Sequence, residues 1–161
     1  MNKVKKYYLI FLNLIFLNLI FFILFYFSIS YANANWYFLS LKNNLVNLRQ
    51  GPSFEYPIKL IYKKKYLPVV VIDKSDAWRQ TKDFENNYGW IHISQLTKRK
   101  SAINKKNKNI VYKKATIYSK PLVMLELGRL VLVEKCKAKW CKVKTGNYIG
   151  WVVKDSLWGR I

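Results

Sequence analysis

Two segments of the chain repeat the same spacing of tryptophan, Gly-Trp and leucine. The copies run Trp78, Gly89-Trp90, Leu96 and Trp140, Gly150-Trp151, Leu157. In both copies the second tryptophan precedes the leucine by six residues, and the two tryptophans are 12 residues apart in the first copy and 11 in the second. Chance does not readily produce this agreement, so the sequence predicts two copies of one small structural unit.

Each copy consists of short apolar or β-branched runs separated by turn residues. We expect strands over residues 45–49, 67–72, 78–81 and 88–93 in the first copy, and over 115–118, 130–134, 140–144 and 148–153 in the second. Trp140, Lys142 and Lys144 alternate with Cys141 and Val143, so one face of that strand is expected to meet solvent. About five short strands in about 50 to 60 residues, of which the four above can be placed in each copy, predict an all-β fold of two small, strongly bent antiparallel barrels in tandem.

The segment between the copies is polar and strongly basic. Residues 98–109 contain six lysines and arginines and a single large aliphatic side chain, Ile103, which buries little surface on its own. Such a composition predicts a solvated linker. The expected division is therefore a first domain over 35–97, a basic linker over 98–109 and a second domain over 110–161.

The first 34 residues have the pattern of an export signal. Lys3, Lys5 and Lys6 form a positive start, residues 7–29 are almost entirely apolar, and Ala32-Asn33-Ala34 supplies the small residues that a signal peptidase reads. We expect cleavage after Ala34. The apolar run is also long enough for a retained membrane anchor over residues 7–29, so both interpretations stay open. In either case the lysines stay in the cytoplasm and the rest of the chain crosses the membrane.

The exported part carries a large positive charge. Residues 35–161 contain 26 basic and 8 acidic side chains, a formal charge of +18. This charge favours anionic partners such as lipid head groups or cell-wall polymers, and export argues against nucleic acid. The alternative is that the lysines reflect the composition of an AT-rich genome and are solvated surface with no partner.

Few residues are available for catalysis or for metal binding. The chain has one histidine, His92, eight carboxylates scattered along the sequence, and two cysteines in one local pair. This set excludes most metal sites and catalytic triads, so we expect no enzyme activity, no catalytic residue, no metal and no cofactor. His92 is expected to be an ordinary strand residue.

Cys136 and Cys141 have a spacing that matches neither a CxxC redox motif nor half of an obvious zinc site. If the strands on either side form a hairpin, the two Cβ atoms face each other across a tight turn, at a separation that a disulfide can bridge. Export places them in an oxidising compartment. We therefore expect a Cys136–Cys141 disulfide.

Residues 46–57, VNLRQGPSFEYP, resemble the "VNLRSGPSxxYP" opening of bacterial SH3-like (SH3b) domains. Trp78 and the run Gly89-Trp90-Ile91-His92 are similar to later strands of that family. The second copy departs at its start, where residues 116–121, TIYSKP, lack the arginine and the glycine. Its tail, Cys136 to Trp158, resembles exported tandem SH3-like proteins that end in "C-W-C … GW … LWG". The resemblance implies SH3-like barrels that bind cell-wall peptide or other extracytoplasmic targets.

A candidate ligand-binding site lies in the opening of the first copy. Gly51 and Pro52 turn the chain sharply after the strand that ends at Arg49. Arg49 is either a ligand for phosphate or carboxylate groups or a brace for its own loop. The expected ligand-binding residues are Arg49, Phe54, Tyr56 and Trp78.

The four tryptophans of the two copies are assigned to the core or to a groove by their place in the strands. Trp90 and Trp151 are expected in the cores, whereas Trp78 and Trp140 at strand starts are candidates for a groove. The first copy has the longer approach, 30 residues from Leu48 to Trp78 against 23 from Ile117 to Trp140, which predicts a longer loop over the first barrel.

Two classes of function follow from these observations. The first is a periplasmic or extracytoplasmic binding module that recognises cell-wall peptide (peptidoglycan) or another anionic envelope component through an aromatic and basic groove. The second is a structural or adaptor protein that binds another envelope protein. Polymer binding through lysines should weaken steeply with ionic strength, whereas an apolar protein interface should not.

Overall fold

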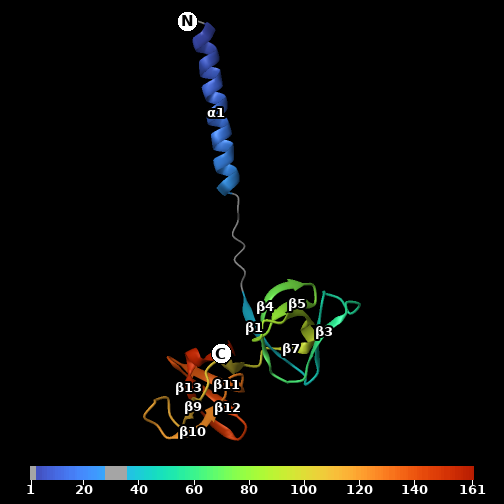
Figure 1. Ribbon diagram of the computed structural model, residues 1–161, viewed down its shortest axis with the longest axis vertical. Coiled ribbons are helices and arrows are strands. Elements are labelled where there is room, and N and C mark those ends of the chain that lie inside the picture. Colours follow the sequence, from blue (N-terminus) through green and yellow to red (C-terminus); the bar gives the residue numbers. More distant parts are fainter. Residues whose placement is uncertain (1–2, 28–35) are drawn as a thin grey trace. The chain divides into compact units, whose positions relative to one another are not determined.

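The computed structural model describes residues 3–27 and 36–161, and the chain divides into two units, Met1–Asn33 and Ala34–Ile161. The described part of the first unit is a single helix, α1 (Lys3–Phe27), and the second unit is built of strands (Figure 1). The expected cleavage site at Ala32-Asn33-Ala34 and the last two residues of the apolar run lie outside the described residues.

The side chains that the structure describes in helix α1, those of Tyr7 and of residues 10–22, are exposed. Among its described side chains, Phe11, Leu17 and Phe21 are exposed, as are their apolar neighbours. The amide Nδ2 of Asn18 donates to the carbonyl oxygen of Leu14 at 2.9 Å, within the helix itself. In the part of the chain that the structure describes, no helix reaches the length and apolar character that crossing a membrane requires.

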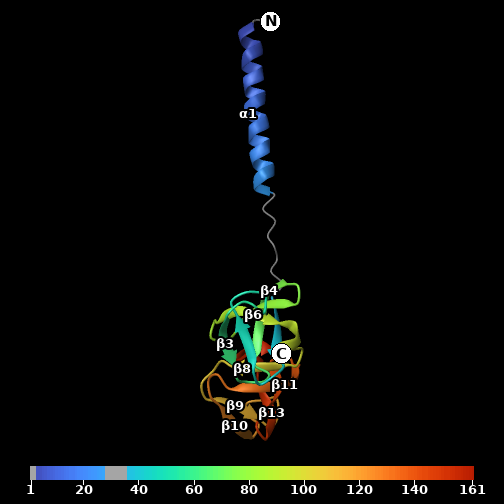
Figure 2. The same cartoon turned by 90° about the vertical axis from the view of Figure 1, so that its right-hand side faces the viewer.

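Residues 36–161 form two seven-stranded antiparallel sheets (Figures 1 and 2). The first sheet has the strands β1 (Tyr37–Leu41), β2 (Val46–Arg49), β3 (Ile58–Tyr62), β4 (Pro68–Ser75), β5 (Trp78–Lys82), β6 (Tyr88–His92) and β7 (Leu96–Thr97), with the 3-10 helix η1 (Ile93–Gln95) before β7. The second has β8 (Ser101–Asn104), β9 (Asn109–Tyr112), β10 (Pro121–Leu125), β11 (Leu130–Lys137), β12 (Trp140–Thr145), β13 (Tyr148–Val153) and β14 (Leu157–Arg160), with η2 (Lys154–Ser156) before β14.

The two sheets have the same topology. The first has the order β3-β2-β6-β5-β4-β1-β7 and the second has β10-β9-β13-β12-β11-β8-β14, so each strand of the first has a counterpart seven places later. The expected all-β fold with two small units in tandem is confirmed.

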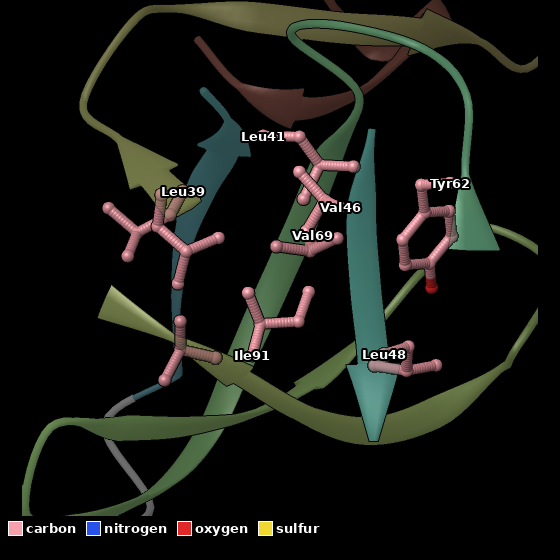
Figure 3. Close-up of a cluster of buried hydrophobic side chains, with 9 residues drawn as sticks. Leu39, Leu41, Val46, Leu48, Tyr62, Val69 and Ile91 are labelled. Atoms are coloured by element: carbon pink, nitrogen blue, oxygen red, sulfur yellow. The ribbon is translucent and has the colours of Figure 1, made fainter. Parts of the chain in front are cut away.

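Each sheet encloses its own core. Figure 3 shows the first core, in which Leu39, Leu41, Val46, Leu48, Tyr62, Val69 and Ile91 converge from five strands. The second core contains Val111, Leu125, Val131, Val143 and Val152. The alternation within strands explains these sets: in β2, Val46 and Leu48 are buried while Asn47 between them is exposed.

The tryptophans of the Gly-Trp pairs are not core residues, contrary to expectation. Trp90 and Trp151 are half-buried on the outer face, and the residues after them, Ile91 and Val152, are fully buried. The preceding glycine is the reason. It occupies an inward position where a Cβ at Gly89 would lie 2.6 Å from the Leu48 side chain, so the alternation sends the tryptophan outward.

The second copy begins earlier than expected. Residues 115–118 are loop, and the strand is β9, Asn109–Tyr112. In the register of the sheets Arg49 pairs with Trp90, and Tyr112 pairs with Trp151. Tyr112 is therefore the counterpart of Arg49, and Val111 that of Leu48.

This alignment removes the expected difference in loop length. The amide of Gln50 donates to the carbonyl oxygen of Pro57 at 3.1 Å, and the amide of Lys113 donates to that of Lys120 at 2.9 Å, so loops 50–57 and 113–120 close in the same way. From Val111 to Trp140 there are 29 residues, against 30 from Leu48 to Trp78. The prediction of a longer approach in the first copy is wrong, because Ile117 is not the counterpart of Leu48.

The predicted basic linker over 98–109 is also wrong. All four residues of β8 are buried, and β8 pairs with β11 and β14 in the second sheet. Asn104 makes this burial possible, because its Nδ2 donates to the carbonyl oxygens of Lys106 and Glu126 and its Oδ1 accepts from the Asn109 side chain at 2.8 Å. The polar residues of β8 are thus buried together with Ala102 and Ile103, because their polar groups are paired.

Only residues 98–100 separate β7 from β8, and the two sheets pack against each other. The hydroxyl groups of Ser40 and Ser101 lie 2.7 Å apart in a buried position. The Nη1 of Arg160 donates to the carbonyl oxygen of Phe38 at 3.0 Å, and the rings of Phe38 and Trp158 meet edge to face with centroids 5.0 Å apart. Residues 34–161 accordingly form one compact unit.

The predicted disulfide is present. Cys136 and Cys141 are directly paired across the β11–β12 hairpin, with Cα atoms 4.0 Å apart, and their sulfur atoms are bonded. Ala138 in the turn has a φ of 44°, a left-handed conformation that lets two residues close the hairpin.

Candidate binding groove on the first sheet

Arg49 holds the loop that follows β2. Its Nη1 donates to the carbonyl oxygens of Phe54 at 2.9 Å and Tyr56 at 2.7 Å, so the guanidinium group fixes the far side of loop 50–57. The guanidinium carbon also lies 5.7 Å from the centre of the Phe54 ring. This geometry corresponds to the brace, one of the two roles expected for Arg49.

Tyr56 lies over the turn of the same loop. A Cβ at Gly51 would stand 2.5 Å from the Tyr56 ring, so the ring packs directly on this glycine. The glycine is needed here because any side chain would displace the tyrosine.

Phe54, Trp78 and His92 form an aromatic cluster on the outer face of the first sheet. Ring centroids are 4.9 Å apart for Phe54 and Trp78, 5.3 Å for Phe54 and His92, and 5.3 Å for Trp78 and His92. Trp78 and His92 are directly opposite each other on β5 and β6. Trp78 is only 7% exposed although it lies outside the main core, because Phe54 folds over it from the loop.

A groove of about 440 Å³ opens beside this cluster. It is lined by Leu45, Asn47, Arg49, Phe54, Ile61, Lys63, Trp78, His92 and Gln95. The structure thus brings together three of the four expected ligand-binding residues, Arg49, Phe54 and Trp78. Tyr56 is not among the lining residues.

Sequence reasoning missed three polar members of the groove, Asn47, His92 and Gln95. The fourth, Lys63, belongs to the run Lys63-Lys64-Lys65, one lysine of which the sequence offers as a partner for a carboxylate. His92 was assigned no role, yet the hairpin register places it opposite Trp78, and its Nδ1 lies 2.7 Å from the hydroxyl of Ser94. The signal for His92 was available, since a hairpin closed over residues 83–87 pairs Trp78 with residue 92. Gln95 accepts a hydrogen bond from Nδ2 of Asn43 at 2.9 Å, and no sequence pattern indicated that contact.

The corresponding surface of the second sheet has different chemistry. Register and loop position give the counterparts Tyr112 for Arg49, Ile117 for Phe54, Glu126 for Lys63, Val153 for His92 and Ser156 for Gln95. Only the tryptophan is kept, as Trp140, and its ring meets Tyr112 edge to face at 5.8 Å. The groove with its cation, imidazole and amides is therefore specific to the first sheet.

Within residues 3–27 and 36–161, no group of three or more histidine, cysteine, aspartate or glutamate side chains is arranged to hold a metal ion.

A family model described as "Bacterial SH3 domain" matches the chain twice, over residues 42–98 and 105–159. The chain is a tandem bacterial SH3 domain protein. The groove described above lies in the first SH3 domain, and its opening segment, residues 46–57, is inside the first match.

Comparison with solved structures gave matches of low similarity. NlpC2 from Trichomonas vaginalis aligns with 12% identity and a TM-score of 0.36, covering 80% of this chain and 50% of that protein. NlpC1 from the same organism aligns with 13% identity and a TM-score of 0.35, covering 81% of this chain and 48% of that protein. This chain thus spans about half the length of either protein. The comparison with curated proteins found no match.

Bacterial SH3 domains are typically non-catalytic binding modules, and many of them bind the cell wall. Membership of the family therefore supports a cell-wall-associated binding module. The family and the disulfide between Cys136 and Cys141 together fit an extracytoplasmic protein.

Proposed function

We propose that this protein is an exported, non-catalytic binding module of the cell envelope. Its first SH3 domain recognises cell-wall peptide, or another anionic envelope component, through the groove beside Phe54, Trp78 and His92. The observation that carries the proposal is the loss of this groove's lining residues at register-equivalent positions of the second domain, although both domains keep the same fold and the same loop length.

The groove combines the groups that a short anionic peptide requires. The aromatic cluster offers flat apolar surface, on which aliphatic side chains or sugar rings pack. Asn47 and Gln95 supply amides for the polar groups of a peptide backbone. Lys63 is exposed at the edge of the groove. In this proposal its ammonium group pairs with a carboxylate of the ligand.

Arg49 and Tyr56 act on this site through the loop. One nitrogen of Arg49 is already engaged by two backbone carbonyl groups, and Tyr56 covers Gly51 outside the groove. In this proposal both residues keep Phe54 in place over Trp78, and Phe54 and Trp78 contact the ligand.

The proposal includes export through residues 1–34, with cleavage after Ala34 or retention of an anchor over residues 7–29. The basic residues before the apolar run and the small residues after it support this part. The disulfide supports it independently, because cysteines are normally reduced in the cytoplasm.

The test is a titration of the full chain, held in a non-ionic detergent, with soluble stem peptides released from purified cell wall. Trp78→Ala should weaken binding by about tenfold or more, since a buried aromatic residue at a binding site often contributes more than 1.4 kcal/mol. Trp140→Ala is the matched control, because it removes the equivalent tryptophan of the second domain and should leave peptide binding unchanged. Circular dichroism of both variants shows whether they remain folded.

Two results would contradict the proposal. Equal losses in both variants would show that the groove of the first domain is not the site. Retention of an envelope protein that persists at high salt, with no affinity for wall peptides, would favour an adaptor role instead.

A further inference from the structure

The positive charge is distributed unequally between the two domains. Residues 35–97 contain 9 basic and 5 acidic side chains, a net charge of +4, whereas residues 98–161 contain 17 basic and 3 acidic side chains, a net charge of +14. The binding groove of the first domain therefore does not explain most of the charge. The second domain requires a separate account.

Four lysines of the second domain share the outer face of the β11–β12 hairpin. Cys141, Val143 and Thr145 point into the core, so Lys142 and Lys144 point outward. The register places Lys135 directly opposite Lys142 and Lys137 directly opposite Trp140. We call this surface, with its members Lys135, Lys137, Trp140, Lys142, Lys144 and Trp151, the lysine face.

The arrangement costs free energy when no anion is present. Like charges directly opposite each other on neighbouring strands repel, and Lys135 and Lys142 form such a pair. Glu134, at the irregularity in β11, relieves part of this repulsion through an ion pair with Lys142 at 3.2 Å. Among the described residues, this is the one ion pair that a lysine of the face makes.

The first domain serves as an internal comparison. At the register-equivalent positions it has Asp73 for Lys135, Ser75 for Lys137 and Gln80 for Lys142, and it keeps a lysine only as Lys82, the counterpart of Lys144. A lysine-rich composition imposed by the genome would act on both copies alike. At three of the four positions the lysine instead appears in only one copy, so composition alone does not account for these three lysines.

Aromatic rings lie among the lysines. Trp151 stands between Lys142 on β12 and Tyr112 on β9, and Tyr112 meets the ring of Trp140 edge to face. These rings are half-buried rather than protruding. A row of flat rings between cations is suited to sugar rings that carry negative groups, because the sugars stack on the aromatic faces while the charges pair with lysines.

We infer that the lysine face is a second binding site, and that it takes an anionic polysaccharide of the envelope. The site is separate from the peptide groove and uses different residues. The disulfide Cys136–Cys141 ties the two strands together within the hairpin and so holds the rows of lysines in register.

The experiment measures binding of polygalacturonate, a carboxylated polysaccharide, to the full chain in non-ionic detergent, with neutral dextran of equal length as the reference ligand. We expect binding of polygalacturonate that weakens steeply with salt, and no binding of dextran. On titration, the indole N–H signals of Trp140 and Trp151 in NMR spectra should shift, and that of Trp78 should not.

The deciding variant replaces three lysines by the residues of the first domain, Lys135→Asp, Lys137→Ser and Lys142→Gln. Its control is Lys105→Asp, Lys106→Gln and Lys108→Asn, in the exposed loop between β8 and β9, which changes the charge by the same four units. The first variant should lose roughly tenfold in affinity, because it removes three lysines of the face and adds one carboxylate. The control should lose much less.

Three results would overturn the inference. Equal losses in the two triple variants would mean that net charge, not this face, attracts the polymer. Unchanged affinity in the first variant would exclude the face. Tighter binding of a single-stranded DNA oligonucleotide than of polygalacturonate, at the same salt concentration, would replace the polysaccharide by a nucleic acid. None of these outcomes depends on the stem-peptide titration, so the inference and the peptide-binding proposal fail separately.

Discussion

Arg49 and Tyr112 occupy the same position in two copies of one sheet, since each pairs with the tryptophan of a Gly-Trp sequence. Arg49 turns toward its loop and holds two carbonyl oxygens of residues 54 and 56, whereas Tyr112 packs its ring against Trp140. The arginine therefore holds the loop of the first domain beside the groove. The tyrosine at the equivalent position does not hold the loop of the second domain in this way.

The first prediction concerns Arg49. Arg49→Ala should lower the free energy of unfolding by about 1–2 kcal/mol, because two hydrogen bonds from a charged donor are lost, and it should weaken peptide binding as Phe54 loses its support. Urea denaturation and the stem-peptide titration measure the two effects. Arg49→Lys keeps the charge but replaces the planar guanidinium group, which also lies against the Phe54 ring, by a compact ammonium group on a different stem. Full recovery of peptide binding in Arg49→Lys would contradict the brace and favour a direct ionic contact.

The second prediction concerns Asn104, which is fully buried. Asn104→Ala should lower the free energy of unfolding by about 1–3 kcal/mol, because it leaves the backbone carbonyl groups of Lys106 and Glu126 without this donor. Asn107→Ala, in the exposed part of the same segment, is the matched control and should change stability by no more than about 0.5 kcal/mol. Equal effects in urea denaturation would restore the interpretation of residues 98–109 as a solvated linker.

The third prediction concerns the disulfide. Reduction, or the double change Cys136→Ala and Cys141→Ala, should lower the free energy of unfolding by about 2 kcal/mol without abolishing folding, because the closed loop is short. Thermal denaturation of the oxidised and reduced protein measures the loss. In protein from the envelope, mass spectrometry without reduction should find the two cysteines linked, and finding two alkylated thiols instead would contradict this.

The fourth prediction concerns Tyr62 at high pH. Burial raises the pKa of this phenol, and the nearby Asp83 carboxylate, which accepts its hydrogen bond at 3.0 Å, raises the pKa further. The folded protein therefore keeps the Tyr62 proton after the unfolded chain has released its own near pH 10. Stability from this group is complete below about pH 10 and is lost as the pH rises beyond it.

Tyr62→Phe tests that prediction. The variant should be less stable at neutral pH, because Asp83 loses a donor, and its stability should decline less steeply than that of the native protein above about pH 10. Parallel decline of the two proteins in alkaline urea denaturation would show that Tyr62 does not contribute.

The fifth prediction concerns export. If the signal is cleaved after Ala34, the mature chain begins at Asn35, because Ala32 and Ala34 stand where a signal peptidase reads small residues. Intact mass of the native protein gives the answer directly. A mass that accounts for all 161 residues would establish the retained anchor instead.

The repeat and the strand patterns predicted the all-β tandem fold, because the spacing of Trp78, Trp90 and Leu96 reflects the β5–β6 hairpin and the strand after it. They misplaced the start of the second copy, because β9 carries neither the arginine nor the glycine that marks β2. The polar and basic composition of residues 98–109 concealed the buried strand over residues 101–104, since the burial of its two polar residues depends on hydrogen bonds to residues distant in the sequence.

The sequence predicted only those residues of the candidate site that lie in local motifs. Arg49, Phe54 and Trp78 belong to recognisable motifs, and their gathering follows from one loop and one hairpin. Lys63 and Gln95 reach the groove from β3's end and from η1, and only the closure of the whole sheet brings those segments beside β2. The lysine face required the register of β11 against β12, including the irregularity after Val133, which no local pattern specifies.

The three-residue connection from β7 to β8, together with the contacts of Ser40 with Ser101 and of Phe38 with Trp158, leaves the two SH3 domains little freedom to reorient. If both proposed sites bind the wall, this arrangement holds them at a fixed spacing. A strand of envelope material that carries both kinds of epitope at that spacing would be held with avidity, and one with another spacing would be held by a single site. The geometry of the junction would then determine which spacing of the two ligand groups in the wall both domains can bind at once.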